Sequence, residues 1–188
     1  MNYITEYIAS GHFQDLKKDN NDLELADSLF LSAQKFYNGN ISEALLALAF
    51  ATVPYKKVPI ELPVLKAVVK YPLVSHNDSM FLKKNDQLPS QLFFNTPQNN
   101  YGDRDKLAHF FGSAYISYQS NIFDLGNLIG YFVEVFEESF KVQSKLDTRD
   151  LETNELGNIF GEMLKKNQYI LPSRVLLLPT LKHFRYTL

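Results

Sequence analysis

The stretch RDLETNELGNIFGEML, residues 149–164, places an Asp, an Asn and two glycines on one face of a predicted helix. Asp150 and Asn154 are four residues apart, Asn154 and Gly157 three, and Gly157 and Gly161 four, so all of them fall near one helical stripe. A stripe that faces water gains nothing from glycine, and a stripe that faces an apolar core has no use for an unpaired Asp. The pattern therefore indicates a polar site buried between closely packed helices.

Two preceding segments carry matching features. Asp105 and His109 are neighbours on one face of a helix predicted from 103 or 105 to 117, and a second helix is expected from 121 or 124 to 144. Thr148 is expected to cap the third helix, which ends near 167. Buried carboxylates need cationic or donor partners. The predicted network comprises Asp105, Lys106, His109, Glu134, Glu137, Glu138, Arg149, Asp150 and Asn154, and the predicted close-packing glycines are Gly126, Gly130, Gly157 and Gly161.

The N-terminal region, residues 1–52, is expected to be helical. Residues 3–17 predict a short amphipathic helix with Gly11 as a weak point. Asp22 is the expected N-cap of a helix over 23–38, Gly39 its C-terminal cap, and Asn40 or Ser42 the start of a helix over 42–52. The pair resembles one tetratricopeptide-type hairpin, but an ordinary helical hairpin is favoured because no second copy follows.

The middle and the end of the chain differ in residue composition from the helical segments. Prolines divide residues 53–102, where only 63–71 predicts a short helix or strand and 91–103 predicts turns. Residues 168–188 form a basic, apolar tail that is expected to pack on the body with Leu176, Leu177 and Leu178 mostly buried; contact with an anionic surface is the alternative. The fold class is mainly α, with an N-terminal hairpin (23–52), a Pro-rich connector (53–102), a three-helix unit (103–167) and the tail, in one compact domain.

Composition excludes several classes of function. The net charge is −2, and the basic and acidic residues are balanced in both halves, so nucleic acid is not an expected partner. The absence of Cys excludes disulfides, thiolate metal sites and a Cys nucleophile. The longest uncharged run after residue 100, residues 107–123, contains Ser, Tyr, Gln and Asn and falls short of a membrane span. A soluble or peripheral protein is expected, either cytoplasmic or in the cell envelope after removal of a signal.

The order of these motifs resembles the VanZ-like domain and the YfiM-type small lipoproteins. Asp105, Lys106, His109 and Phe110 match the first element, and Glu134 with Glu137 or Glu138 matches the acidic element. The last element is matched by Arg149, Asp150, Asn154, Gly157 and Gly161. The resemblance covers about residues 101–165 and implies a role at the cell envelope. VanZ-like domains span membranes several times, whereas these helices are short and polar, so that location is not carried over.

Two functions remain open at this point. The favoured one is a non-enzymatic, envelope-associated or accessory protein without a cofactor, whose buried network serves folding or the binding of a protein partner. The alternative is a metal-dependent hydrolase acting on a lipid or envelope substrate. In that case Asp105, His109, Glu134 and Glu138 would hold a divalent metal, with His109, Glu134 and Glu138 as the catalytic candidates.

Overall fold

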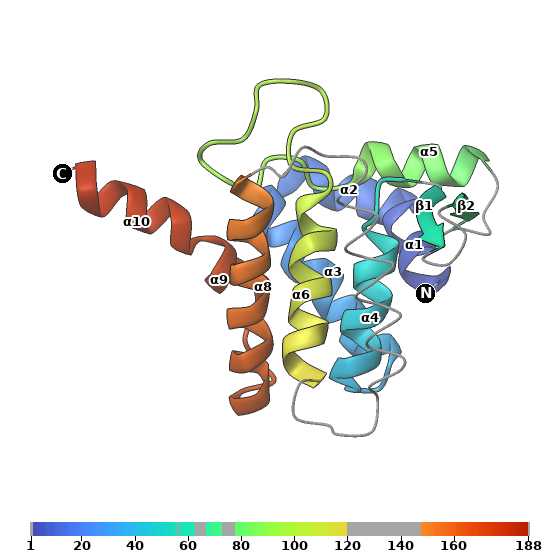
Figure 1. Cartoon of the computed structure of the whole chain (residues 1–188). Coiled ribbons are helices and arrows are strands. Elements are labelled where there is room, and N and C mark those ends of the chain that lie inside the picture. The colour runs from blue at the N-terminus through green and yellow to red at the C-terminus, as the bar shows by residue number, and fades with distance from the viewer. Residues whose placement is uncertain (1, 56, 63–66, 73–77, 120–147, 188) are drawn as a thin grey trace.

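The protein is mainly helical, as its sequence predicts (Figure 1). The computed structural model describes residues 2–55, 57–62, 67–72, 78–119 and 148–187. The described elements are α1 (Asn2–Ile8), α2 (Gly11–Asp19), α3 (Asp22–Phe36), α4 (Ile41–Ala51), β1 (Lys57–Leu62), β2 (Ala67–Pro72), α5 (Asp78–Gln87), α6 (Lys106–Gln119), α8 (Thr148–Lys166), α9 (Pro172–Leu176) and α10 (Leu178–Thr187).

The predicted N-terminal hairpin is formed by α3 and α4, but its first cap differs from the prediction. Asn21, not Asp22, caps α3: its side chain accepts bonds from the backbone N–H groups of Leu23 and Glu24. The Glu24 carboxylate in turn accepts from the Asn21 N–H, which completes a capping box. Asp22 instead accepts bonds from the Ser90 and Gln91 N–H groups at 2.7 and 2.6 Å, and so ties the loop after α5 to the start of α3.

The turn between α3 and α4 follows the predicted chemistry. Asn38 and Gly39 both have a positive φ, 51° and 82°, and the Gly39 N–H donates to the Gln34 carbonyl. This is the left-handed termination that Gly and Asn allow. Asn40 then caps α4 by accepting from the Glu43 N–H. The preference for an ordinary helical hairpin over a tetratricopeptide-type one stays a prediction.

The single helix expected over residues 3–17 was a wrong prediction. The segment forms α1 and α2, separated at Ala9 and Ser10. Ser10 caps α2 by accepting from the Phe13 N–H, so Gly11 is the first residue of a new helix rather than a weak point within one. The N-cap preference of Ser decided the boundary.

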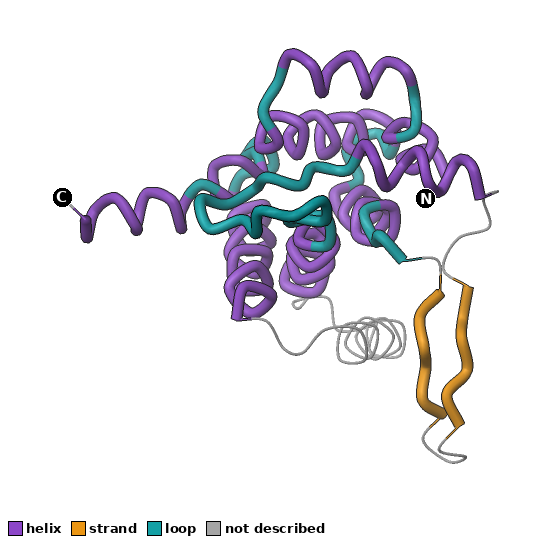
Figure 2. The backbone as a smooth tube through the Cα atoms, turned by 90° about the horizontal axis from the view of Figure 1, so that it is seen from above, coloured by secondary structure: helices purple, strands orange, loops and turns teal. Residues whose placement is uncertain are grey.

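The Pro-rich connector contains an antiparallel hairpin of β1 and β2, which projects from the helical body in Figure 2. The strand option for residues 63–71 is confirmed over 67–71, since β2 spans Ala67–Pro72, whereas β1, which contains Pro59, was not predicted. The turns expected over 91–103 are present: Gly102 has a φ of 56°, and the Asp103 N–H donates to the Ser90 carbonyl.

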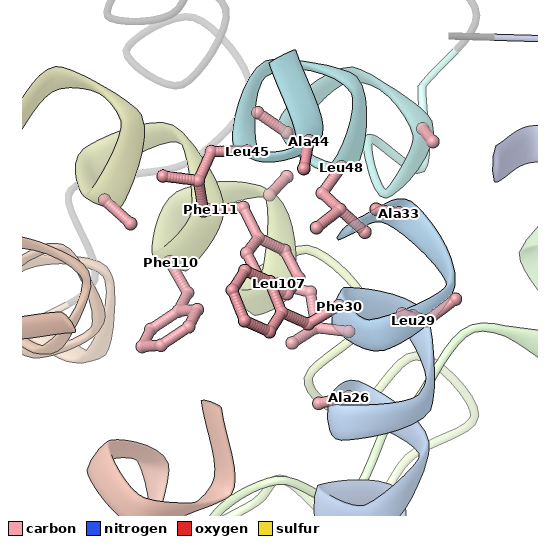
Figure 3. Packing of buried hydrophobic residues seen from close by; sticks show 14 of the residues in the cluster. Ala26, Leu29, Phe30, Ala33, Ala44, Leu45, Leu48, Leu107, Phe110 and Phe111 are labelled. Atoms are coloured by element: carbon pink, nitrogen blue, oxygen red, sulfur yellow. The ribbon is translucent and has the colours of Figure 1, made fainter. Parts of the chain in front are cut away.

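The core lies where α3, α4, α6 and α8 meet, and Figure 3 shows much of its apolar packing. The ring of Phe160 on α8 lies 5.2 Å from that of Phe30 and 5.1 Å from that of Phe110, centroid to centroid. Leu48 of α4 lies next to Ala33 of α3, and Leu45 of α4 extends toward Phe111 of α6. These apolar contacts fix α6 and α8, the helices that carry the predicted site.

The prediction that Leu176, Leu177 and Leu178 of the tail are mostly buried was correct for Leu176 and wrong for the other two. Leu176 is buried against the body, but Leu177 and Leu178 are exposed. The α10 helix extends away from the other helices in Figures 1 and 2. The apolar character of the tail therefore does not signal burial along its whole length.

Lys84 on α5 predicts a pH dependence of stability. It is buried, donates to the Val53 carbonyl at 2.6 Å, and has its pKa lowered by burial to about 7. Between pH 7 and the unfolded pKa of 10.5 the unfolded chain binds more protons, so stability should rise with pH. We expect this group to add about 2 kcal/mol between pH 7 and pH 9.

Urea unfolding at these two pH values measures the gain, and Lys84→Met should abolish it. Lys83→Met, at the exposed neighbouring position, is the matched control and should retain it. An equal pH dependence in the wild type and Lys84→Met would contradict the assignment.

Candidate functional site: a buried polar network between α6 and α8

The helices α6 and α8 run parallel and side by side (Figure 1). Residues later in α6 contact residues later in α8: Lys106 contacts Asp150, Ser113 contacts Asn154, and Ser117 contacts Glu162. A parallel arrangement places the two helix N-termini at the same end of the pair. The predicted polar residues gather at this end.

Two predicted glycines bring the helix backbones together. A Cβ atom added at Gly157 would lie 2.3 Å from the Phe110 carbonyl oxygen, and one at Gly161 would lie 2.5 Å from that of Ala114. Neither distance can be accommodated by a side-chain rotation, because both involve backbone atoms. The close-packing role predicted for Gly157 and Gly161 is confirmed.

Lys106 lies at the centre of the network. Its ammonium nitrogen is 2.5 Å from an Asp150 carboxylate oxygen and 3.1 Å from an Asp105 oxygen, and the residue is only 3% exposed. Burial alone would lower the pKa of Lys106, but the two carboxylates outweigh it and raise that pKa above its ordinary value. The ammonium group is therefore charged and compensates buried negative charge.

His109 extends the network along α6. Its Nε2 atom lies 3.5 Å from Asp150, and its Nδ1 atom lies 3.1 Å from the side-chain oxygen of Asn154. The Ser113 hydroxyl donates to the same oxygen at 3.1 Å. Burial lowers the pKa of His109, partly opposed by the charges of Asp150 and Asp105, so the ring is neutral near pH 7. The Asn154 oxygen can only accept, which assigns the ring proton to Nδ1.

Arg149 forms a second ion pair next to the first. It donates to Asp103, a fully buried carboxylate that also accepts from the Thr96 hydroxyl and the Leu92 and Phe93 N–H groups. Asp103 is predicted from the sequence only as a possible start of the helix, so this contact is not foreseen. Through it Arg149 joins α8 to the loop before α6.

The helix termini explain why carboxylates gather here. Asp105 immediately precedes α6 and its carbonyl accepts from the Ala108 and His109 N–H groups, while Asp150 lies in the first turn of α8. The N-terminus of a helix carries partial positive charge, and two parallel helices place two such ends together. Asp105 and Asp150 offset this charge, and Lys106 compensates the excess of negative charge that they leave.

Part of the predicted site lies outside the described residues. Glu134, Glu137, Glu138, Gly126 and Gly130, and the helix expected over 121–144, all fall there. What the sequence indicates for these residues stays a prediction. Among the described residues, Asp105, Lys106, His109, Arg149, Asp150 and Asn154 lie at one end of the α6–α8 pair, as predicted.

Two tyrosines near the network were not predicted. The hydroxyl groups of Tyr55 and Tyr101 are 2.7 Å apart, and partial burial raises the pKa of both, with the charges of Asp105 and Asp150 adding to the effect. These residues come from two loops and are separated by 46 positions. No periodicity in the sequence connects them, so no local signal could have placed them beside the carboxylates.

The network also has the composition of a metal site. One oxygen each of Asp105 and Asp150 and one nitrogen of His109 lie within 4.8 Å of one another, and all three residues are buried. Oxygen and imidazole ligands suit a hard or borderline divalent ion. The Lys106 ammonium, however, contacts both carboxylates and would have to withdraw before a cation could bind between them.

The chain was compared with family models, curated proteins and solved structures. No family model, curated protein or solved structure matches the chain. Within the described residues, no helix has the length and apolar character needed to cross a membrane.

Proposed function

We propose that this chain is a VanZ-like accessory protein of the cell envelope, without enzymatic activity. Its Lys106 network holds α6 and α8 in register, and the resulting rigid pair serves as a platform for a protein partner. The observation that carries this proposal is the position of the Lys106 ammonium, which lies buried between Asp105 and Asp150. The Lys106 ammonium group, which belongs to the chain itself, already supplies the positive charge that compensates these carboxylates.

The convergence of the first and last motifs supports the VanZ-like assignment. Asp105, Lys106 and His109 carry the first motif, and Asp150 and Asn154 carry the last. These residues are separated by about 45 positions, yet their side chains form direct contacts. The glycines of the last motif allow those contacts, because they let the two backbones approach.

The burial of the network favours a role in folding and specificity over catalysis. A general acid or base must reach its substrate, whereas Lys106, His109 and Asp150 are almost fully buried. Buried ion pairs contribute little net stability but penalise arrangements in which either partner is left alone. The network therefore selects one register of α6 against α8.

A metal-dependent hydrolase acting on a lipid or envelope substrate is the second candidate. It is favoured by the tautomer of His109: with the proton on Nδ1 and directed at Asn154, the Nε2 lone pair faces Asp150. An oriented imidazole of this kind is the usual form of a metal-binding histidine. Asp105 and Asp150 would be its oxygen ligands, and the bound ion would activate water.

Metal analysis and chelation separate the two candidates. The accessory-protein proposal predicts no stoichiometric divalent metal in the purified protein and no change in melting temperature when a chelator is added. A resident metal would stabilise the folded state through its binding free energy, so that chelation would lower the melting temperature.

Variants make the same experiment specific to the site. If chelation destabilises the wild type, and His109→Ala and Asp105→Asn remove that response while the surface variant Asp15→Asn retains it, the hydrolase candidate replaces the proposal. Asp15 pairs with Lys18 on an exposed face of α2 and provides the matched acidic control.

A further inference from the structure

The tail helix α10 exposes its apolar side chains instead of burying them. Leu178, Leu181 and Phe184 are 40%, 54% and 55% exposed. They are spaced three residues apart and so follow one side of the helix. The helix itself extends away from the body (Figures 1 and 2).

One contact between α10 and the body involves the opposite side of the helix. His183 stacks on Phe94 of the loop before α6, with 4.3 Å between ring centroids. His183 is two residues from Leu181, which places it about 200° around the helix. The helix is therefore anchored by one face while its apolar face is directed outward.

The charge of the tail differs in sign from that of the rest of the chain. Residues 168–188 contain Arg174, Lys182 and Arg185 and no acidic residue, a charge of +3. Residues 1–167 then contain 16 basic and 21 acidic residues, because the whole chain has 19 and 21, and their charge is −5. Lys182 and Arg185 are exposed on α10 itself, next to the apolar side chains.

We infer that α10 binds an anionic lipid surface, lying in the interface with Leu178, Leu181 and Phe184 inserted and with Lys182 and Arg185 at the headgroups. Apolar residues on one face with basic residues beside them are the composition of interfacial helices. Docking of α10 against the α10 of a second copy fits less well, because it would bring the same positive charges together. The inference concerns the tail and is independent of the buried network, so the two proposals fail separately.

The absence of Trp from the chain provides a direct probe. Phe184→Trp introduces a single indole on α10, and Leu82→Trp introduces one at a similarly exposed position, 61% exposed, on α5. Vesicles of phosphatidylcholine with phosphatidylglycerol should shift the emission of Phe184→Trp to the blue and leave that of Leu82→Trp unchanged. Equal responses of the two probes, or no response, would overturn the inference.

Co-sedimentation with the same vesicles tests the residues that bind. Leu181→Asp/Lys182→Glu should lower vesicle affinity by about tenfold or more, since each basic residue near an anionic surface contributes about fivefold. Leu82→Asp/Lys83→Glu changes the same Leu-Lys dipeptide on α5 and should bind like the wild type. Added salt, or replacement of phosphatidylglycerol by phosphatidylcholine, should also weaken binding.

Two results of this assay would overturn the lipid assignment. The first is the absence of vesicle binding by the wild type, and the second is binding that neither salt nor the α10 variant reduces. If the first result is accompanied by a concentration-dependent dimer in analytical ultracentrifugation that Leu181→Asp/Lys182→Glu abolishes, α10 is assigned to a second copy. None of these results depends on the response to chelation, so a failure of the lipid inference can be distinguished from a failure of the proposed function.

Discussion

Gly157→Leu should lower the free energy of unfolding by about 2–4 kcal/mol. The reason is the backbone contact at this position: even a Cβ atom would lie 2.3 Å from the Phe110 carbonyl oxygen and 2.8 Å from the Ser113 Cβ. Relief requires α6 and α8 to separate, which also disturbs the core contact between Phe110 and Phe160. Urea unfolding followed by circular dichroism measures the change.

Gly11 supplies a matched control for the same substitution. It is helical, and nothing lies within 4 Å of a Cβ atom built on it. Gly11→Ala should be neutral or slightly stabilising, because it reduces the freedom of the unfolded chain, whereas Gly157→Ala should already be destabilising. Equal effects of the two alanine variants would refute the close contact.

The sequence predicts most of what lies within a single helix. The third C-terminal helix, expected to follow a cap at Thr148 and to end near 167, agrees with α8 (Thr148–Lys166) to within one residue at each end, because the apolar spacing and the Gly pair are local signals. The residues that share a stripe, such as Asp150 and Asn154, follow from the same periodicity. Local spacing therefore placed the correct side chains on the correct faces.

Contacts between elements were predicted less well, because they depend on how helices pack. Arg149 is next to Asp150 in sequence, yet the two residues point in different directions, and Arg149 pairs with Asp103 in the preceding loop. The Asp22 carboxylate accepts a hydrogen bond from the Ser90 N–H in a loop from the middle of the chain, and Asn21 caps α3 instead. For α10, composition predicted apolar contacts but not whether the body or another surface supplies them.

Lys106→Met should be the most damaging substitution in the network. It keeps the length of the side chain and removes the ammonium group, which leaves the Asp150 and Asp105 carboxylates buried with their charge uncompensated. Breaking a buried pair in this way costs about 3–5 kcal/mol. Lys18→Met is the matched control, since Lys18 pairs with Asp15 on an exposed face and such pairs contribute little.

The central claim is that Lys106 and Asp150 stabilise each other as a charge-compensated pair, and a double-mutant cycle measures this most directly. Unfolding free energies are needed for the wild type, Lys106→Met, Asp150→Asn and the double variant. The account predicts that the double variant is more stable than the sum of the single effects implies, by about 1–3 kcal/mol, because Asp150→Asn removes one of the two carboxylate charges that Lys106→Met leaves uncompensated. Additivity of the two single effects to within about 0.5 kcal/mol would contradict it.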